Sequence, residues 1–163
     1  DEPVPACDAV WLPGGYPELH AATLSASRHT APGLRAHVAA GRPLWAECGG
    51  MMPLFENLVT VDGTSHAGWG LLPGRVLVQP RLAALGPQQL TLPAGSLRGH
   101  TFHYSRCESP LAPALHTESQ RGGVRGLGEA VYRQGSLQAS YFHAWFASSP
   151  AATASLFLPA EGA

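Results

Sequence analysis

The chain has 163 residues, and its ten basic residues are all arginine, against eleven acidic residues, which gives a formal net charge of −1. This balance argues against a nucleic-acid-binding protein, which would carry a basic face. Because the sequence contains no lysine, it excludes a lysine Schiff base and a phosphate-binding loop of the GxxxxGK(S/T) type. No apolar run reaches the roughly 18 residues that cross a membrane. Three cysteines without a framework spacing predict a reduced, cytoplasmic setting.

The first half of the chain alternates short strands with helical segments. Residues 8–12 form an apolar run that ends at Pro13-Gly14-Gly15, which predicts a buried strand followed by a glycine turn. After a loop-rich stretch, a helix is expected near residues 33–40, and a second strand at residues 44–47. A second helix is expected at residues 51–58. This alternation predicts an α/β fold with a parallel sheet.

The second half is richer in strands and is expected to add antiparallel pairs to that sheet. Strands are predicted at residues 75–79, 88–92 and 99–104, a hairpin at residues 131–141 around Gln134-Gly135, a closing helix at residues 150–158, and an exposed loop at residues 121–126. His143 stands at the end of the last predicted strand. About 160 residues are enough for one domain with a proper core.

Cys48 stands where the second predicted strand meets the second predicted helix, which is the layout of a nucleophile elbow. Such a turn exposes the sulfur at the carboxyl edge of the sheet, and the N-terminus of the helix is expected to lower the pKa of the thiol. The backbone N–H of Gly49 and one from Gly14-Gly15 are candidate donors of an oxyanion hole. Among eight histidines, His143 is the best-placed base. A buried, unreactive cysteine is the simpler interpretation, but this setting makes it the weaker one.

Four motifs then occur in order along the chain, and together they are specific although each is modest alone. They are Leu12-Pro13-Gly14-Gly15-Tyr16-Pro17-Glu18, Ala46-Glu47-Cys48-Gly49-Gly50-Met51-Met52, Arg98-Gly99-His100-Thr101-Phe102-His103-Tyr104-Ser105 and Ala139-Ser140-Tyr141-Phe142-His143. This set resembles the class I glutamine amidotransferase domain of the cobyrinic and hydrogenobyrinic acid a,c-diamide synthases. The resemblance covers residues 8 to about 158 and implies a flavodoxin-like fold.

The resemblance also implies a role for each matching residue. Cys48 would attack the side-chain amide of L-glutamine and form a γ-glutamyl thioester, and His143 would activate Cys48 and protonate the departing ammonia. Gly15 and Gly49 would stabilise the oxyanion, while Gly14, His103, Tyr104 and Ser105 would lie beside the substrate. The family implies no cofactor or metal in this domain. ATP and Mg²⁺ would act in a synthetase domain or subunit, where the a and c carboxylates of a corrinoid in cobalamin biosynthesis are amidated.

This sequence departs from the family pattern in three ways. Many class I glutaminases have a glutamate two residues after the histidine, and this chain has Trp145, so no local carboxylate orients His143. Where many have glutamine four residues after the nucleophile, this chain has Met52. The resemblance also implies that a synthetase domain and a first strand–helix–strand unit precede the residues present here. We therefore expect residues 1–163 to be a glutaminase domain that lacks this unit, with an incomplete sheet.

Several residues allow other interpretations. His100, His103, Cys107 and His116 could form a metal site, although the family resemblance accounts for the first two. Glu18 and Glu47 could be catalytic carboxylates, but a helix start and a buried partner at the elbow are the favoured roles. Trp45, Trp69 and Trp145 could stack on a corrin ring, but core positions are favoured.

Two further functions compete with the glutaminase. Trp145 and the missing unit would suit a non-catalytic remnant that only binds a synthetase. The same elbow would also suit another cysteine hydrolase on this scaffold, such as a peptidase. Neither alternative involves nucleic acid or a membrane.

Overall fold

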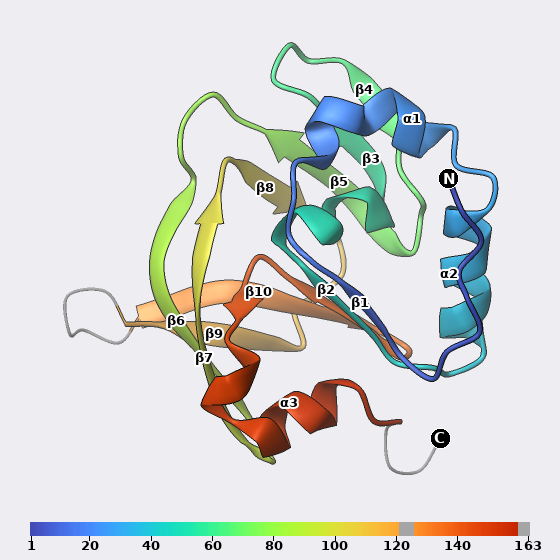
Figure 1. Ribbon diagram of the computed structural model, residues 1–163. Helices are drawn as coiled ribbons and strands as arrows, with labels where there is room; N and C mark the ends of the chain where they lie inside the picture. Colours follow the sequence, from blue (N-terminus) through green and yellow to red (C-terminus); the bar gives the residue numbers. More distant parts are fainter. Residues whose placement is uncertain (121–125, 160–163) are drawn as a thin grey trace.

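The computed structural model describes residues 1–120 and 126–159 of the chain (Figure 1). Its strands are β1 (Val10–Leu12), β2 (Leu44–Glu47), β3 (Phe55–Val59), β4 (Ser65–Ala67), β5 (Leu72–Val78), β6 (Ala84–Leu92), β7 (Gly95–His103), β8 (Ser105–Glu108), β9 (Leu115–Ser119), β10 (Gly126–Gln134), β11 (Leu137–Ser140) and β12 (His143–Ala144). Its α-helices are α1 (Ala21–Ser25), α2 (Thr30–Ala39) and α3 (Pro150–Leu156). Short 3₁₀ turns are η1 (Pro17–His20), η2 (Cys48–Gly50), η3 (Met52–Leu54) and η5 (Phe146–Ser148).

The larger sheet has its strands in the order β1-β2-β11-β10-β9-β6-β7-β12. β2 runs parallel to both of its neighbours, β1 and β11, and the remaining pairs of this sheet are antiparallel. This confirms the predicted parallel sheet with antiparallel additions. Because the carboxyl ends of parallel strands meet at one edge, the glycine turn after β1, Cys48 after β2 and the segment after β11 lie close together.

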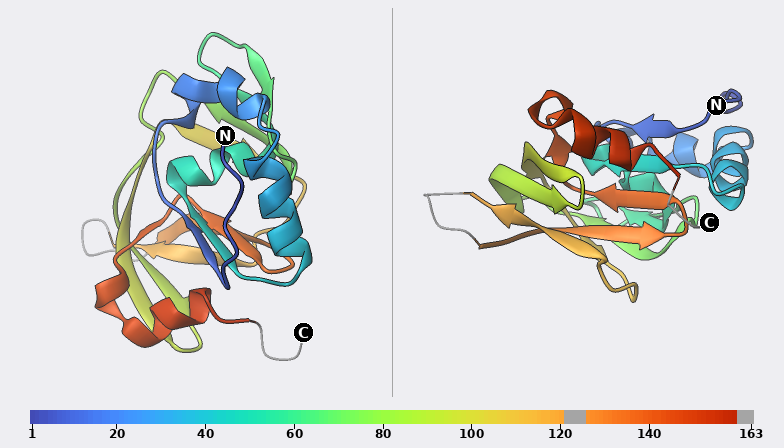
Figure 2. Two further views of the ribbon diagram at one scale, coloured as in Figure 1. Left: turned by 45° about the vertical axis from the view of Figure 1, so that its right-hand side comes forward. Right: turned by 90° about the horizontal axis from the view of Figure 1, so that it is seen from below.

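The long β6 and β7 hairpin lies on one side of the molecule and α2 on the other, beyond β1 and β2 (Figure 1). Figure 2 shows that the strands of the larger sheet do not lie in one plane, since the β6 and β7 hairpin turns away from β1 and β2. A smaller sheet, in the order β4-β3-β5-β8, packs beside it. No helix formed by residues 1–120 and 126–159 has both the length and the hydrophobicity that crossing a membrane requires.

Strand β2 is buried on both faces, as is typical of a central parallel strand. On one face Leu44 and Ala46 pack with Leu34 of α2 in the larger core. On the other face Trp45 packs with Leu156 of α3 in a second core. The two cores hold β2 firmly, and β2 ends at Cys48.

The helix predicted at residues 51–58 is wrong. The chain instead forms η2 and η3 and then β3, which pairs with β4 and β5. The spacing of the apolar residues allowed either structure, because the two buried residues of β3, Phe55 and Leu58, are three positions apart and would also share a helix face.

Two other predictions, the exposed loop and the missing strand–helix–strand unit, involve residues that the structure does not describe. Residues 121–125 of the predicted exposed loop lie outside the described residues, and Gly126 begins β10. Within the described residues β1 is the edge strand next to β2. The further strand–helix–strand unit beyond β1 stays a prediction.

Candidate active site

Cys48 directly follows β2 and has a φ of +46°, the only positive φ of a non-glycine residue within the described chain. A left-handed conformation costs an L-residue about 1–2 kcal/mol, and such strain is often retained at functional sites. The turn directs Sγ out of the sheet, where the thiol donates a hydrogen bond to the Phe102 carbonyl at 3.6 Å. This is the sharp turn of a nucleophile elbow, built here from 3₁₀ turns in place of the predicted helix.

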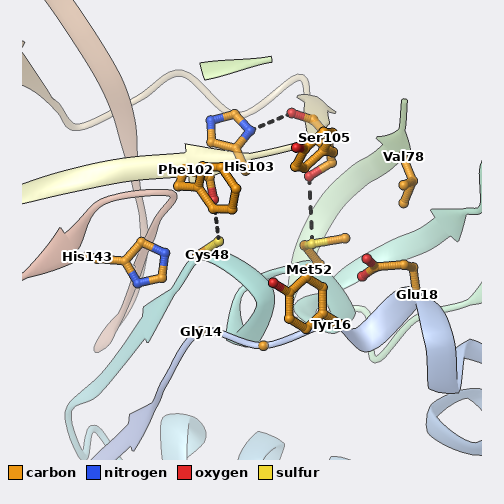
Figure 3. A pocket seen from close by; sticks show the side chains of 12 residues that line it. Gly14, Tyr16, Glu18, Cys48, Met52, Val78, Phe102, His103, Ser105 and His143 are labelled. Atoms are coloured by element: carbon orange, nitrogen blue, oxygen red, sulfur yellow. Dashed lines mark hydrogen bonds between the residues drawn. The ribbon is translucent and has the colours of Figure 1, made fainter. Parts of the chain in front are cut away.

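The thiol lies on a pocket of about 250 Å³ (Figure 3). Ligand pockets commonly measure about 300–1,000 Å³, so this one suits a small metabolite. Its walls come from the turn after β1, the elbow, β5, the end of β7 and β12, and the lining residues are Gly14, Gly15, Tyr16, Glu18, Cys48, Met52, Val78, Phe102, His103, Tyr104, Ser105 and His143. Every predicted site residue except Gly49 lines this pocket.

Gly49 lies directly behind the pocket wall, against the backbone of Gly15. A Cβ at Gly49 would come within 2.6 Å of both the nitrogen and the carbonyl carbon of Gly15, and closer still to its oxygen. The peptide N–H of Gly49 also hydrogen-bonds toward the sulfur of Cys48. The structure therefore brings the two predicted oxyanion residues into contact beside Cys48, at a separation that only glycine at position 49 allows.

Gly14 lies against the imidazole of His143. A Cβ at Gly14 would come 3.2 Å from Nδ1 of that ring and closer to Cε1. Any side chain at this position would displace the ring. Gly14 therefore leaves the space that the imidazole of His143, the predicted base, occupies.

His143 lies on the short strand β12, next to Cys48 at one end of the pocket (Figure 3). Its ring stacks on His100 of β7, with ring centres 4.8 Å apart and planes 9° apart. Burial lowers the pKa of His143, and the neighbouring His100 and His103 lower it further. His143 is therefore neutral near pH 7, and neutral imidazole is the form that accepts a proton.

His103 is nearly buried, and the protein occupies both of its ring nitrogens. Nδ1 lies 2.7 Å from the Ser105 carbonyl and Nε2 lies 3.2 Å from a carboxylate oxygen of Glu129. Burial alone would raise the pKa of Glu129, but the hydrogen bond and charge of His103 and a hydrogen bond from Thr101 hold it below its usual value. Contacts at both nitrogens therefore fix the His103 ring in the pocket wall.

The Ser105 hydroxyl is also engaged with the protein. It lies 2.8 Å from the Tyr141 hydroxyl, and the ring of Tyr141 stacks on His103 at 3.7 Å. Tyr104, by contrast, is 43% exposed. Four residues were predicted to lie beside the substrate. Among the three that carry a side chain, Tyr104 has the most accessible one, while His103 and Ser105 shape the wall.

The predicted lowering of the Cys48 pKa is wrong. The pKa of the Cys48 thiol is raised to about 11, chiefly by burial. The hydrogen bond from the Gly49 N–H opposes this rise, and the nearby carboxylates Glu18, Glu129 and Glu47 add to it. The physical reason is that no full helix follows Cys48, so its dipole is absent, while the elbow buries the sulfur. In the free protein Cys48 is a neutral thiol beside a neutral imidazole.

This charge state predicts how Cys48 reacts with iodoacetamide. The alkylation rate should rise about tenfold for each pH unit between about 7 and 9, because the thiolate fraction does so below the pKa. Mass spectrometry of the Cys48 peptide measures this rate. The peptide of Cys107, whose pKa burial raises to about 12, is an internal control and should react more slowly. A Cys48 rate that levels off below about pH 8 would show a thiolate–imidazolium pair instead.

Comparison with known proteins adds an independent observation to this geometry. Residues 1–151 match the CobB/CobQ-like glutamine amidotransferase domain. The chain belongs to this family. The CobB/CobQ-like domain also resembles a solved structure described as a glutamine amidotransferase, with a TM-score of 0.56, 20% identity, and coverage of 91% of this chain and 77% of that one. This likeness supports the flavodoxin-like class I amidotransferase fold.

Curated relatives give the more specific likeness. The domain is 49% identical over 160 residues to the cobyrinate a,c-diamide synthase of Herminiimonas arsenicoxydans, covering 98% of this chain and 36% of that protein. It is 48% identical over 163 residues to the hydrogenobyrinate a,c-diamide synthase of Pseudomonas aeruginosa, covering 100% of this chain and 37% of that protein. The chain thus spans little more than a third of these relatives' length.

Among the alternative interpretations, the metal site is not supported. In the part of the CobB/CobQ-like domain that the structure describes, no three His, Cys, Asp or Glu side chains gather as a metal site. His100 stacks on His143, His103 contacts Glu129, and the Cys107 thiol donates to the Tyr141 hydroxyl at 3.5 Å.

The tryptophan prediction is partly wrong. Trp45 and Trp69 are buried as expected, but Trp145 is 56% exposed and lies under the Arg98 guanidinium at 4.7 Å. Glu18 lies in the first turn of η1, as favoured, and also lines the pocket.

Sequence reasoning missed several parts of the site. The Phe102 carbonyl, Val78 and Tyr16 lie in the pocket wall, and Glu129 holds His103 from β10. Tyr16 and Phe102 belong to two of the four sequence motifs. Their position next to predicted site residues in those motifs could have predicted that they line the pocket. Glu129 stands in no motif, and only the three-dimensional fold brings it to His103.

Proposed function

We propose that this CobB/CobQ-like domain hydrolyses L-glutamine at Cys48 and supplies the ammonia that amidates the a and c carboxylates of cobyrinate or hydrogenobyrinate. The observation that supports this most is the strained Cys48 turn, which faces His143 and the Gly15–Gly49 contact across one small pocket. The acceptor follows from the names of the relatives, which are a,c-diamide synthases.

The first half of the reaction forms a thioester. His143 takes the proton of the Cys48 thiol as Sγ attacks the side-chain carbonyl carbon of glutamine. The carbonyl oxygen becomes an oxyanion, which the N–H groups of Gly15 and Gly49 stabilise. The tetrahedral intermediate then collapses, the proton on His143 passes to the amide nitrogen, and ammonia leaves. Deprotonation during the attack is required because the free thiol, with its pKa of about 11, is neutral.

The second half regenerates the enzyme. A water molecule gives a proton to His143 and attacks the γ-glutamyl thioester, the same N–H groups stabilise the second oxyanion, and Sγ leaves with the proton. The sum is glutamine plus water to glutamate plus ammonia. The main chain of glutamine would lie beside His103 in the pocket wall, and the exposed side chain of Tyr104 offers a hydroxyl.

Amide formation needs ATP-dependent activation of the acceptor, and the family resemblance implies that a synthetase domain provides it. The sequence has no lysine for a phosphate loop, and the described residues form no metal-ligand cluster. ATP, Mg²⁺ and the corrinoid would therefore bind to a synthetase domain or subunit that works with this one.

Transfer of the glutamine nitrogen tests this proposal. The full-length protein is incubated with cobyrinic or hydrogenobyrinic acid, ATP, Mg²⁺ and glutamine labelled with ¹⁵N in its side-chain amide. Mass spectrometry should show one labelled nitrogen at each of the a and c positions. Cys48→Ala should stop incorporation from glutamine, while ammonium chloride should still support amidation. Label incorporation in Cys48→Ala, or none in the wild type, would contradict the proposal.

A further inference from the structure

The carboxylate of Glu47 connects the two halves of the proposed site. Glu47 is the last residue of β2, directly before Cys48, and its side chain is buried. One carboxylate oxygen accepts the backbone N–H of Ala144 at 3.2 Å and the indole N–H of Trp45 at 2.7 Å. Ala144 directly follows His143. A single side chain therefore joins the residue before the nucleophile to the residue after the base, which are 97 positions apart in the sequence.

Strand β12 has few other attachments. It has two residues, and it pairs with β7 through His143 with His100 and Ala144 with Gly99. On that side the strands approach so closely that a Cβ at Gly99 would strike the His143 carbonyl oxygen. Glu47 holds β12 from the other side, so β12 lies between a backbone ladder and this carboxylate.

The imidazole of His143 has no carboxylate of its own within the described residues. It stacks on His100, and the neighbouring His100 and His103 add to the lowering of its pKa by burial. Trp145, at the position where many class I glutaminases have glutamate, points to solvent. The ring position therefore depends on its neighbours Gly14 and His100 and on the backbone of β12.

A buried carboxylate is costly unless its oxygens receive hydrogen bonds. Burial raises the pKa of Glu47, and donors from Trp45, Ala144 and Trp11 oppose that effect. Three donors from β1, β2 and β12 thus converge on this one group. A side chain that served only to fill the core beside Trp45 would not need to be acidic.

We propose that Glu47 is the positioning residue for His143: its carboxylate oxygen fixes the backbone of β12 through the Ala144 N–H and so sets the imidazole against the Cys48 thiol. This role rests on the proposed glutaminase function. It accounts for how the site orients its base without a carboxylate on the imidazole. This role depends on the position of the acceptor oxygen and not on the negative charge of the carboxylate.

Variants of Glu47 in the full-length protein test this. Glu47→Leu keeps the volume and removes the acceptor, and kcat for ammonia release from glutamine should fall about 10²-fold, since a small misplacement of a catalytic group costs that much, while KM for glutamine changes little. Glu47→Asp, which cannot reach Ala144, should behave likewise and serves if Glu47→Leu does not fold. Glu47→Gln keeps an acceptor oxygen and should restore kcat to within about threefold of the wild type.

Trp45→Phe is the matched control. It removes the other hydrogen bond to the same oxygen and disturbs the same core, but it leaves the Ala144 contact in place. It should lower thermal stability and leave kcat nearly unchanged. An unchanged kcat in Glu47→Leu, an equal loss in Trp45→Phe, or a Glu47→Gln variant as slow as Glu47→Leu would overturn the role. If hydrolysis survived in Cys48→Ala, the proposed function itself would fail, which is a separate result.

Discussion

Replacing Cys48 with alanine is expected to reduce glutamine hydrolysis by the full-length protein at least about 10³-fold, to the background rate. The variant keeps the pocket, the Gly15–Gly49 contact and His143, but it removes the sulfur atom that would form the proposed thioester. Loss of the nucleophile should appear in kcat, with little effect on glutamine binding, because the binding walls stay in place. Ammonia release coupled to a glutamate dehydrogenase assay measures it. Hydrolysis at the wild-type rate would favour a non-catalytic role for this site.

Cys48→Gly provides a control that separates chemistry from folding. It should be as inactive as Cys48→Ala but more stable by about 1 kcal/mol. Glycine relieves the strain of the left-handed turn, worth about 1–2 kcal/mol, and loses about 0.4–1 kcal/mol through a more disordered unfolded chain. The φ of +46° at Cys48 is the reason to expect the glycine variant to be more stable than the alanine variant. Denaturant titration of the two variants measures it. Equal stability, or a less stable glycine variant, would contradict the strained elbow.

The second large effect is expected from Gly49→Ala. The new methyl group would overlap the peptide of Gly15, so the two backbones must separate and their N–H groups can no longer converge on one oxyanion. Loss of one such donor costs about 10²–10³-fold in kcat, and the overpacking should lower the free energy of unfolding by about 1–3 kcal/mol. Steady-state kinetics and denaturant titration measure the two effects.

Gly126→Ala is the matched control for this substitution. Gly126 lies at the start of β10, and a Cβ there would meet no atom within 4 Å. This variant should keep both the activity and the stability of the wild type. If Gly49→Ala behaves in the same way as Gly126→Ala, the close packing of the oxyanion residues has no part in catalysis.

Local signals in the sequence predicted the parts of the fold that depend on short-range physics. The apolar run Leu44–Glu47 between Pro43 and Cys48 is strand β2, and the turn at Gln134-Gly135 joins β10 to β11. The motif residues also predicted most of the pocket wall, because carboxyl ends of parallel strands share one edge. In each case the local sequence pattern agrees with the place of the segment in the folded protein.

The rest of the site depends on contacts between distant parts of the chain. The stacking of His100 on His143 follows from the pairing of β7 with β12, and two residues are too few to carry a strand pattern. The Glu47–Ala144 hydrogen bond joins segments that only the folded sheet brings together. The pKa of Cys48 was predicted with the wrong sign because the expected helix after it was replaced by 3₁₀ turns, which leaves burial as the larger effect.

In the proposed reaction, Cys48 attacks the side chain of glutamine bound in this pocket. An electrophilic glutamine analogue, 6-diazo-5-oxo-L-norleucine, tests it most directly. Its ketone carbon takes the place of the amide carbon, and its diazomethyl carbon, at the place of the amide nitrogen, alkylates the thiol and releases N₂. We predict a single covalent adduct per chain, located on the Cys48 peptide by mass spectrometry and suppressed by excess L-glutamine. Cys7 and Cys107, the other free cysteines, should remain unmodified. An unlabelled Cys48 in the folded full-length protein, or labelling that glutamine does not suppress, would contradict the claim.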